Sequence, residues 1–179
     1  DETFAKHSIG LLLVEPILGR GGVRPAPDGW LRAISASARR HGAVVAFDEI
    51  KTGFGRTGDW WASTHANVTP DLLCVGKAIA GGYPLSACIG TRAVMDAWGA
   101  STGEALHTQT FLGHPVACAA GIASLQQLKA LDAPSRCKER GLAIREALAA
   151  HGFAHRGRGL MLAAEVGAPT TPEQALPAP

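Results

Sequence analysis

Two ionisable residues, Asp48 and Lys77, each follow a short apolar run, residues 43–47 and residues 72–76. Such runs predict buried strands, and open α/β sheets bind ligands at the carboxyl ends of their strands. An amine and an acid placed there suit pyridoxal phosphate, because the amine can form a Schiff base and the acid can keep the pyridine nitrogen protonated. We therefore expect an active site around this pair.

The chain has 179 residues, of which 46% are hydrophobic and 18% charged, and its net charge is +2. This composition is ordinary for a globular protein, and the scattered lysines and arginines indicate neither a nucleic-acid nor a membrane partner. Small-molecule chemistry is therefore favoured. The four cysteines form no CxxC pair, so we expect reduced thiols in a cytoplasmic protein. The chain begins without Met, which indicates a fragment or a processed chain.

Short apolar runs alternate with amphipathic stretches, which predicts an α/β fold with a mostly parallel sheet flanked by helices. Asp28 is expected to cap the first helix, and Gly42 to end it. Residues 19–29 are expected to form turns, and the tail from residue 168 to residue 179 to be disordered. The expected strands span residues 11–14, 43–48, 72–75, 86–90 and 160–166, and the expected helices span residues 30–41, a stretch that Pro115 begins, and residues 135–151.

Four stretches carry motifs in a characteristic order and spacing, and Asp48 and Lys77 lie 29 positions apart. The stretches are VEPILGRGG (14–22), FDEIKTGFGRTG (47–58), PDLLCVGKAIAGGYP (70–84) and HTQTFLGHP (107–115). Together they resemble the class III pyridoxal-phosphate-dependent aminotransferases, the omega-aminotransferase group of the type I fold. The resemblance covers residues 10–166, and it implies an internal fragment of a longer enzyme.

The resemblance implies a role for each of several residues. Lys77 would hold the coenzyme covalently and move the substrate proton, and Asp48 would pair with the pyridinium nitrogen. Ile50 would lie against the ring face. Thr110 matches the threonine that binds the phosphate of the neighbouring subunit's coenzyme, so a working site would need a homodimer. Glu15 would have a supporting role near the coenzyme.

The family also implies a domain plan and an activity. Residues 1–131 would be the central part of the coenzyme-binding large domain, and residues 132–167 the start of the C-terminal domain. The intact protein would transfer an amino group from a primary amine or omega-amino acid to a keto acid or aldehyde. Alternatives are an aminomutase, racemase or decarboxylase of the same fold, because groups outside this chain decide which substrate bond breaks. A catalytically incomplete fragment is a further alternative.

The sequence departs from the family pattern at two positions. Lys51 stands where many members have a Gln that hydrogen-bonds the coenzyme's phenolic oxygen. Lys51 could donate to that oxygen or compete as a second amine, but only Lys77 has the matching Gly-Lys-Ala setting. Arg20 stands where glutamate-using members often have Glu, so the resemblance does not imply glutamate as the substrate.

Each assignment has a plainer alternative. Asp48 could cap a turn, Lys77 could be solvated, and Thr110 could simply begin a turn. Residues 53–58 satisfy the dinucleotide pattern GxGxxG, but no helical periodicity follows and the preceding acids would repel a pyrophosphate. Residues 156–159 are expected to form a turn rather than a nucleic-acid element.

Histidine and tryptophan residues elsewhere in the chain could act as metal ligands or as walls of the site. The histidines are not spaced like metal ligands, so no metal site is expected, and surface or turn roles are favoured for His65, His107 and His114. The pair Trp60-Trp61 could be a packing anchor or a substrate wall, and the sequence leaves that choice open.

Overall fold

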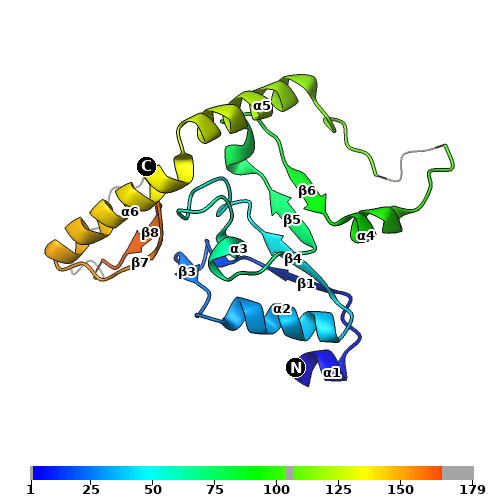
Figure 1. Ribbon diagram of the computed structural model, residues 1–179, viewed down its shortest axis with the longest axis horizontal. Helices are drawn as coiled ribbons and strands as arrows, with labels where there is room; N and C mark the ends of the chain where they lie inside the picture. Colours follow the sequence, from blue (N-terminus) through cyan, green and yellow to red (C-terminus); the bar gives the residue numbers. More distant parts are fainter. Residues whose placement is uncertain (1, 104–106, 167–179) are drawn as a thin grey trace, which may run out of the picture.

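The computed structural model describes residues 2–103 and 107–166, and it contains a four-stranded sheet with helices around it (Figure 1). The strands are β1 (Leu11–Val14), β2 (Ile17–Leu18), β3 (Arg24–Pro25), β4 (Val44–Asp48), β5 (Leu72–Val75), β6 (Ala87–Gly90), β7 (His155–Arg158) and β8 (Met161–Ala164). The helices are α1 (Glu2–Lys6), α2 (Trp30–Arg40), α3 (Ala62–His65), α4 (Arg92–Met95), α5 (Pro115–Ala130) and α6 (Ala133–Ala150), with the 3₁₀ turns η1 (Lys77–Ala80) and η2 (Asp96–Trp98).

The main sheet has the strand order β1-β4-β5-β6. β4 pairs in parallel with both β1 and β5, whereas β6 runs antiparallel to β5. This arrangement confirms the predicted α/β fold with a mostly parallel sheet. The antiparallel direction of β6 follows from its connection, because the short segment between η1 and β6 returns the chain without a crossover helix.

Helix α2 packs on β1 and β4 and forms the main hydrophobic core with them. Leu31 and Ala38 of α2 are buried with Val45 and Phe47 of β4. These apolar positions recur at helical spacing in α2 and follow one another in β4, so the two patterns match a helix packed on a central strand. The core therefore sits directly behind the strand that ends at Asp48.

The prediction that Asp28 caps α2 is wrong. The N-cap position is Gly29 with a left-handed backbone (φ 75°), and no side chain caps the helix. Asp28 instead forms an ion pair with Arg158 of β7 at 3.6 Å. Gly42, with φ 77°, does follow the end of α2 as expected.

Two small hairpins replace segments that were expected to be turns. Residues 19–29 contain β3, which pairs with β2, and residues 156–158 belong to β7, which pairs with β8. The sequence did not predict β7, because its Gly and Arg residues are not typical of a strand pattern. Strand β8 is shorter than the expected 160–166.

From Pro115 to Ala164 the chain consists of the two long helices α5 and α6 and the hairpin β7–β8 (Figure 1). Pro115 begins α5, as predicted, and Asp132 separates α5 from α6 with a left-handed backbone (φ 46°). A Cβ on Gly141 of α6 would lie 2.1 Å from the carbonyl oxygen of Gly159, so glycine allows α6 to pack closely on the hairpin. Among the described residues, no helix is both long and apolar enough to cross a membrane.

Candidate active site

The pairing of β4 with β5 brings Asp48 and the segment that leads to Lys77 to one edge of the sheet. Asp48 lies opposite Cys74 in the parallel register, and the next amide, that of Glu49, donates to the Cys74 carbonyl oxygen at 2.9 Å. Lys77 follows Cys74 by three residues and begins η1. Both residues therefore stand at the carboxyl ends of adjacent parallel strands, where open α/β sheets bind ligands.

Asp48 is half-buried and lines an open cavity of about 570 Å³. Its Oδ1 accepts a hydrogen bond from the Ile50 amide at 2.9 Å. This local bond fixes the carboxylate at the end of the strand. Glu15, at the end of β1, lines the same cavity. The sequence-predicted Asp48 and Glu15 are thus brought together.

Lys77 has an exposed side chain and a left-handed backbone, with φ 42°. That conformation is uncommon for a residue with a Cβ, and such strain is concentrated at functional sites. The preceding Gly76 lies beside Ile50, because a Cβ added there would meet Ile50 Cγ2 at 3.5 Å. Ile50 is therefore next to the backbone that presents Lys77.

Lys51 folds over the glycine turn that follows β2. A Cβ added at Gly19 would lie 2.8 Å from Lys51 Nζ, and the Gly19 amide donates to Glu15 Oε2 at 3.0 Å. The Lys51 amine and the Glu15 carboxylate thus both lie against Gly19. Arg20, the next residue in the turn, is exposed.

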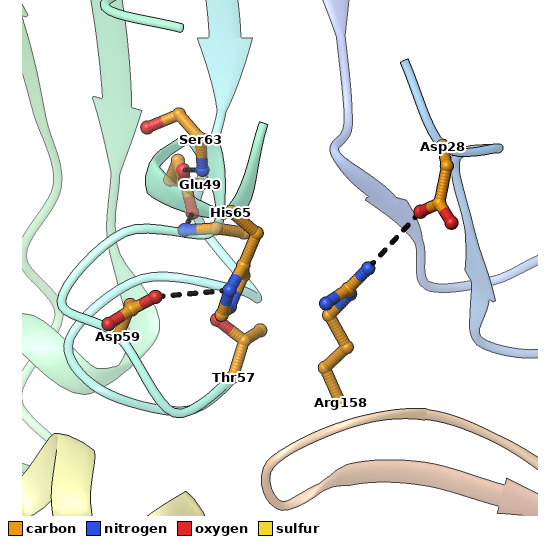
Figure 2. A network of polar contacts seen from close by, with 8 residues as sticks. Asp28, Glu49, Thr57, Asp59, Ser63, His65 and Arg158 are labelled. Atoms are coloured by element: carbon orange, nitrogen blue, oxygen red, sulfur yellow. Dashed lines mark hydrogen bonds and ion pairs between the residues drawn. The ribbon is translucent and has the colours of Figure 1, made fainter. Parts of the chain in front are cut away.

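The buried carboxylate of Glu49 anchors the loop that follows β4, and this role was not predicted from the sequence. Its side chain is 0% exposed and accepts hydrogen bonds from the Thr52 hydroxyl and from the Ala62 amide at 2.9 Å. It also accepts from the Ser63 amide at 2.8 Å (Figure 2). A buried carboxylate needs such donors to offset its lost hydration. The sequence signal for this role was the position of Glu49 directly after Asp48. A second acid at the end of a buried strand needs hydrogen-bond donors of its own.

His65, at the end of α3, contacts two residues of the loop that follows β4. Its Nδ1 lies 3.0 Å from Asp59 Oδ2, and its Nε2 lies 3.1 Å from the Thr57 hydroxyl oxygen (Figure 2). The surface or turn role predicted for His65 is thus replaced by a partly buried contact. His114 does take a turn role, since its Nδ1 accepts from the Ala117 amide at the start of α5.

The glycine-rich segment 53–58 forms turns within this loop and does not open a helix. The helix that follows, α3, has four residues and begins at Ala62, after the last glycine of the pattern. The dinucleotide fingerprint requires a helix at that glycine, so the structure agrees with the rejection of a dinucleotide site. Trp61 packs edge-on against Phe54 with ring centroids 5.0 Å apart, which favours its role as a packing anchor.

Thr110 lies in an exposed turn between η2 and α5 and does not line the cavity of Asp48 and Glu15. Of the predicted residues, Asp48 and Glu15 line that cavity, whereas Lys77, Ile50, Lys51 and Thr110 do not. No cluster of three or more potential metal-ligating side chains occurs within residues 2–103 and 107–166.

Cys74 stands between Asp48 and Cys88 across three adjacent strands. Burial raises the pKa of its thiol above the 9.0 of a free cysteine, and the neighbouring Cys88 and Asp48 raise it further. Both neighbours oppose a negative charge on the Cys74 sulfur. The residue beside Asp48 is thus a neutral thiol at physiological pH.

The fold and the site define an α/β protein in which adjacent parallel strands carry an acid and a lysine to one sheet edge. A family model, aminotransferase class III, matches residues 2–178, and the chain belongs to that family. It is 38% identical over 161 residues to the acetylornithine aminotransferase of Methanosarcina mazei, with 87% of this chain and 39% of that protein covered. The chain thus spans about two fifths of the length of the curated relatives it matches.

Solved structures agree with this assignment. The ornithine aminotransferase of Toxoplasma gondii matches with a TM-score of 0.85 and 35% identity, over 93% of this chain and 40% of that one. An omega-transaminase of Thermomicrobium roseum matches with a TM-score of 0.85 and 33% identity, over 93% of this chain and 39% of that one. These similarities confirm the predicted family and fold, and the roles of the individual site residues stay predictions.

Proposed function

We propose that the intact protein is a pyridoxal-phosphate-dependent transaminase, with Asp48 and Lys77 at the centre of its site. Membership of the class III family supports the activity. The single structural observation that carries the proposal is the parallel pairing of β4 and β5, which puts the acid and the lysine at one sheet edge. The T. gondii structure is described as having partial occupancy of PLP at its active site.

The residues present fit the coenzyme chemically. Pyridoxal phosphate supplies an aldehyde that a lysine amine can bind and a ring that accepts electrons when its nitrogen is protonated. The exposed Lys77 would provide the amine, and its Nζ would then carry the proton that leaves the substrate carbon. The Asp48 carboxylate would hold the proton on the ring nitrogen. Ile50, beside Gly76, would pack on the ring.

We further propose that the working enzyme is a cytoplasmic homodimer with its site at the subunit interface. The exposed position of Thr110, away from the Asp48 cavity, is consistent with binding a phosphate held by a partner subunit. Residues 1–131 would belong to the coenzyme-binding domain and residues 132–167 to the start of the C-terminal domain. The left-handed Asp132 between α5 and α6 supports that boundary. The tail 168–179 lies outside the described residues.

The proposed substrates are a primary amine or omega-amino acid as donor and a keto acid or aldehyde as acceptor. The names of the relatives, acetylornithine and ornithine aminotransferases and an omega-transaminase, support donors whose reacting amine lies at the end of a chain. Glu15 and Lys51, which both contact the Gly19 turn, would act on the coenzyme side of the cavity as supporting residues.

Absorbance of the intact protein with pyridoxal phosphate tests the proposal. The wild type is expected to show the visible band of coenzyme bound covalently to a lysine, and borohydride reduction followed by peptide mapping is expected to locate it at Lys77. Lys77→Ala should lose the band, whereas Lys51→Ala, the matched control, should keep it. A band that persists in Lys77→Ala would contradict the assignment.

A further inference from the structure

Cys74 and Cys88 face each other across the antiparallel strands β5 and β6. The carbonyl oxygen of Cys74 accepts a hydrogen bond from the Glu49 amide, which follows β4, at 2.9 Å, so the backbone of Cys74 bonds toward β4 and not toward β6. Hydrogen-bonded and non-hydrogen-bonded pairs alternate along an antiparallel ladder. Leu73 and its partner are therefore hydrogen-bonded, and the next pair, Cys74 with Cys88, is of the non-hydrogen-bonded kind.

This kind of pair has the geometry that a disulfide requires. In a non-hydrogen-bonded antiparallel pair the Cα atoms are about 4.5 Å apart and the side chains lie on the same face of the sheet. A disulfide tolerates Cα separations of roughly 4.4–6.8 Å. Cys74 and Cys88 are both free thiols in the structure, and the Cys88 thiol is near enough to raise the pKa of Cys74.

We propose that Cys74 and Cys88 form an oxidation-sensitive thiol pair that closes to a cross-strand disulfide. The oxidant is a low-molecular-weight disulfide such as oxidised glutathione. The exposed Cys88 attacks one sulfur of the oxidant as a thiolate and releases one glutathione thiolate. The Cys74 thiolate then attacks Cys88 Sγ and releases the second glutathione. The two cysteines lose two protons and two electrons, and two molecules of reduced glutathione leave.

The position of the pair connects it to the coenzyme site, and this step depends on the proposed function. Residues opposite one another in a ladder share a face of the sheet, so Asp48, Cys74 and Cys88 form a row across β4, β5 and β6. Closing the disulfide draws the Cβ atoms of the two cysteines to about 3.8 Å and removes the thiol proton of Cys74. We infer that oxidation alters the surroundings of Asp48 and the approach to Lys77.

The other two cysteines provide matched controls within the same chain. Cys118 lies in α5 and Cys137 in α6, and both are free thiols of intermediate exposure. Neither occupies a strand, so neither belongs to a cross-strand pair of the main sheet. Cys118→Ser and Cys137→Ser should therefore leave the oxidation behaviour unchanged.

The first experiment needs no coenzyme and tests the thiol pair alone. The intact protein is equilibrated with reduced and oxidised glutathione, the remaining thiols are alkylated, and unreduced peptides are mapped by mass spectrometry. A Cys74–Cys88 linked peptide is expected in the wild type and in the two control variants, and not in Cys74→Ser or Cys88→Ser. At a constant ratio of the two glutathione forms, the oxidised fraction should fall as total glutathione rises, because two reduced molecules are released. Three results would overturn the proposal. One is an oxidised fraction that depends only on the ratio of the two glutathione forms, with glutathione attached to Cys88. The others are a disulfide between two chains and the absence of any oxidation.

The second experiment tests the link to the coenzyme site. The dissociation constant of pyridoxal phosphate is measured for the reduced and the oxidised wild type, and Cys88→Ser is measured under the same two conditions. Oxidation is expected to weaken binding by about tenfold in the wild type, the equivalent of one charge-assisted hydrogen bond, and to have no effect in Cys88→Ser. Equal binding by both forms would overturn the link but not the disulfide. If the reduced protein does not bind the coenzyme, the proposed function fails, and the peptide map still decides the thiol pair.

Discussion

Asp48 lies opposite Cys74 in the parallel pairing of β4 and β5, with the Glu49 amide bonded to the Cys74 carbonyl oxygen at 2.9 Å. This hydrogen bond connects the end of β4 to β5 just before the chain leaves β5 and enters η1. Backbone hydrogen bonds between β4 and β5 therefore hold the two strand ends together, and the Asp48 side chain adds a local bond from the Ile50 amide at 2.9 Å. Substitution of either side chain should leave the sheet edge intact, so its chemical role can be tested separately from folding.

Asp48→Asn is expected to lower kcat by about a hundredfold while covalent binding of the coenzyme at Lys77 persists. An amide keeps the shape of the side chain but carries no charge to hold a proton on the ring nitrogen. Steady-state kinetics of the intact protein, together with its absorbance spectrum, measure the two effects separately. Asp96→Asn, at an exposed residue of η2, is the control and should behave as the wild type. Unchanged kcat in Asp48→Asn would remove this residue from the mechanism.

Glu49→Gln is expected to lower the free energy of unfolding by about 3 kcal/mol. The fully buried carboxylate accepts from the amides at the start of α3 and from the Thr52 hydroxyl, and an amide group cannot satisfy all of these donors. Denaturant unfolding of the intact protein measures the loss. The control, Glu139→Gln on the exposed surface of α6, should change stability by less than about 0.5 kcal/mol. Equal effects of the two substitutions would show that the buried network contributes little.

Gly141→Ala is expected to destabilise the packing of α6 on the hairpin β7–β8 by about 1–3 kcal/mol. The new methyl group would lie 2.1 Å from the carbonyl oxygen of Gly159, and backbone atoms cannot move aside as a flexible side chain can. Gly10→Ala is the matched control, since a Cβ at Gly10 meets nothing within 4 Å. Thermal unfolding of both variants should separate them clearly. If both melt alike, the close approach of α6 to the hairpin is wrong.

Alkylation of Cys74 in the folded protein is expected to become fast only above pH 9.0, and alkylation of the unfolded chain near that value. Burial, Cys88 and Asp48 raise the pKa of this thiol from 9.0, and the thiolate is the reactive form. The Cys74 thiol binds its proton more tightly in the folded state than in the unfolded chain. Its contribution to folding stability is therefore complete below pH 9.0 and decreases as the pH rises through the pKa of the folded state. Peptide-resolved iodoacetamide labelling over a pH series measures both midpoints. A folded midpoint at or below the unfolded one would refute the shift.

Several local elements could be predicted from the sequence because their signals lie within a few residues of one another. Strand β1, strand β5 and the start of α5 at Pro115 were predicted at their observed positions. Helix α2 was predicted to within one residue. The family was also identified from four short motifs. Local signals failed where glycine and arginine occur inside a strand, as in β7, and where a cap was expected from an exposed acid, as with Asp28.

The amino-acid sequence by itself determined the chemical types at the two strand ends, an acid at position 48 and an amine at position 77, and the apolar runs that bury those strands. Only the tertiary structure decided that β4 and β5 are neighbours, that Glu49 is buried on three donors, and that Cys74 faces Cys88. The physical reason is that strand order, strand direction and register depend on contacts between residues far apart in the chain. Those contacts form only when the hydrophobic faces of several elements pack together.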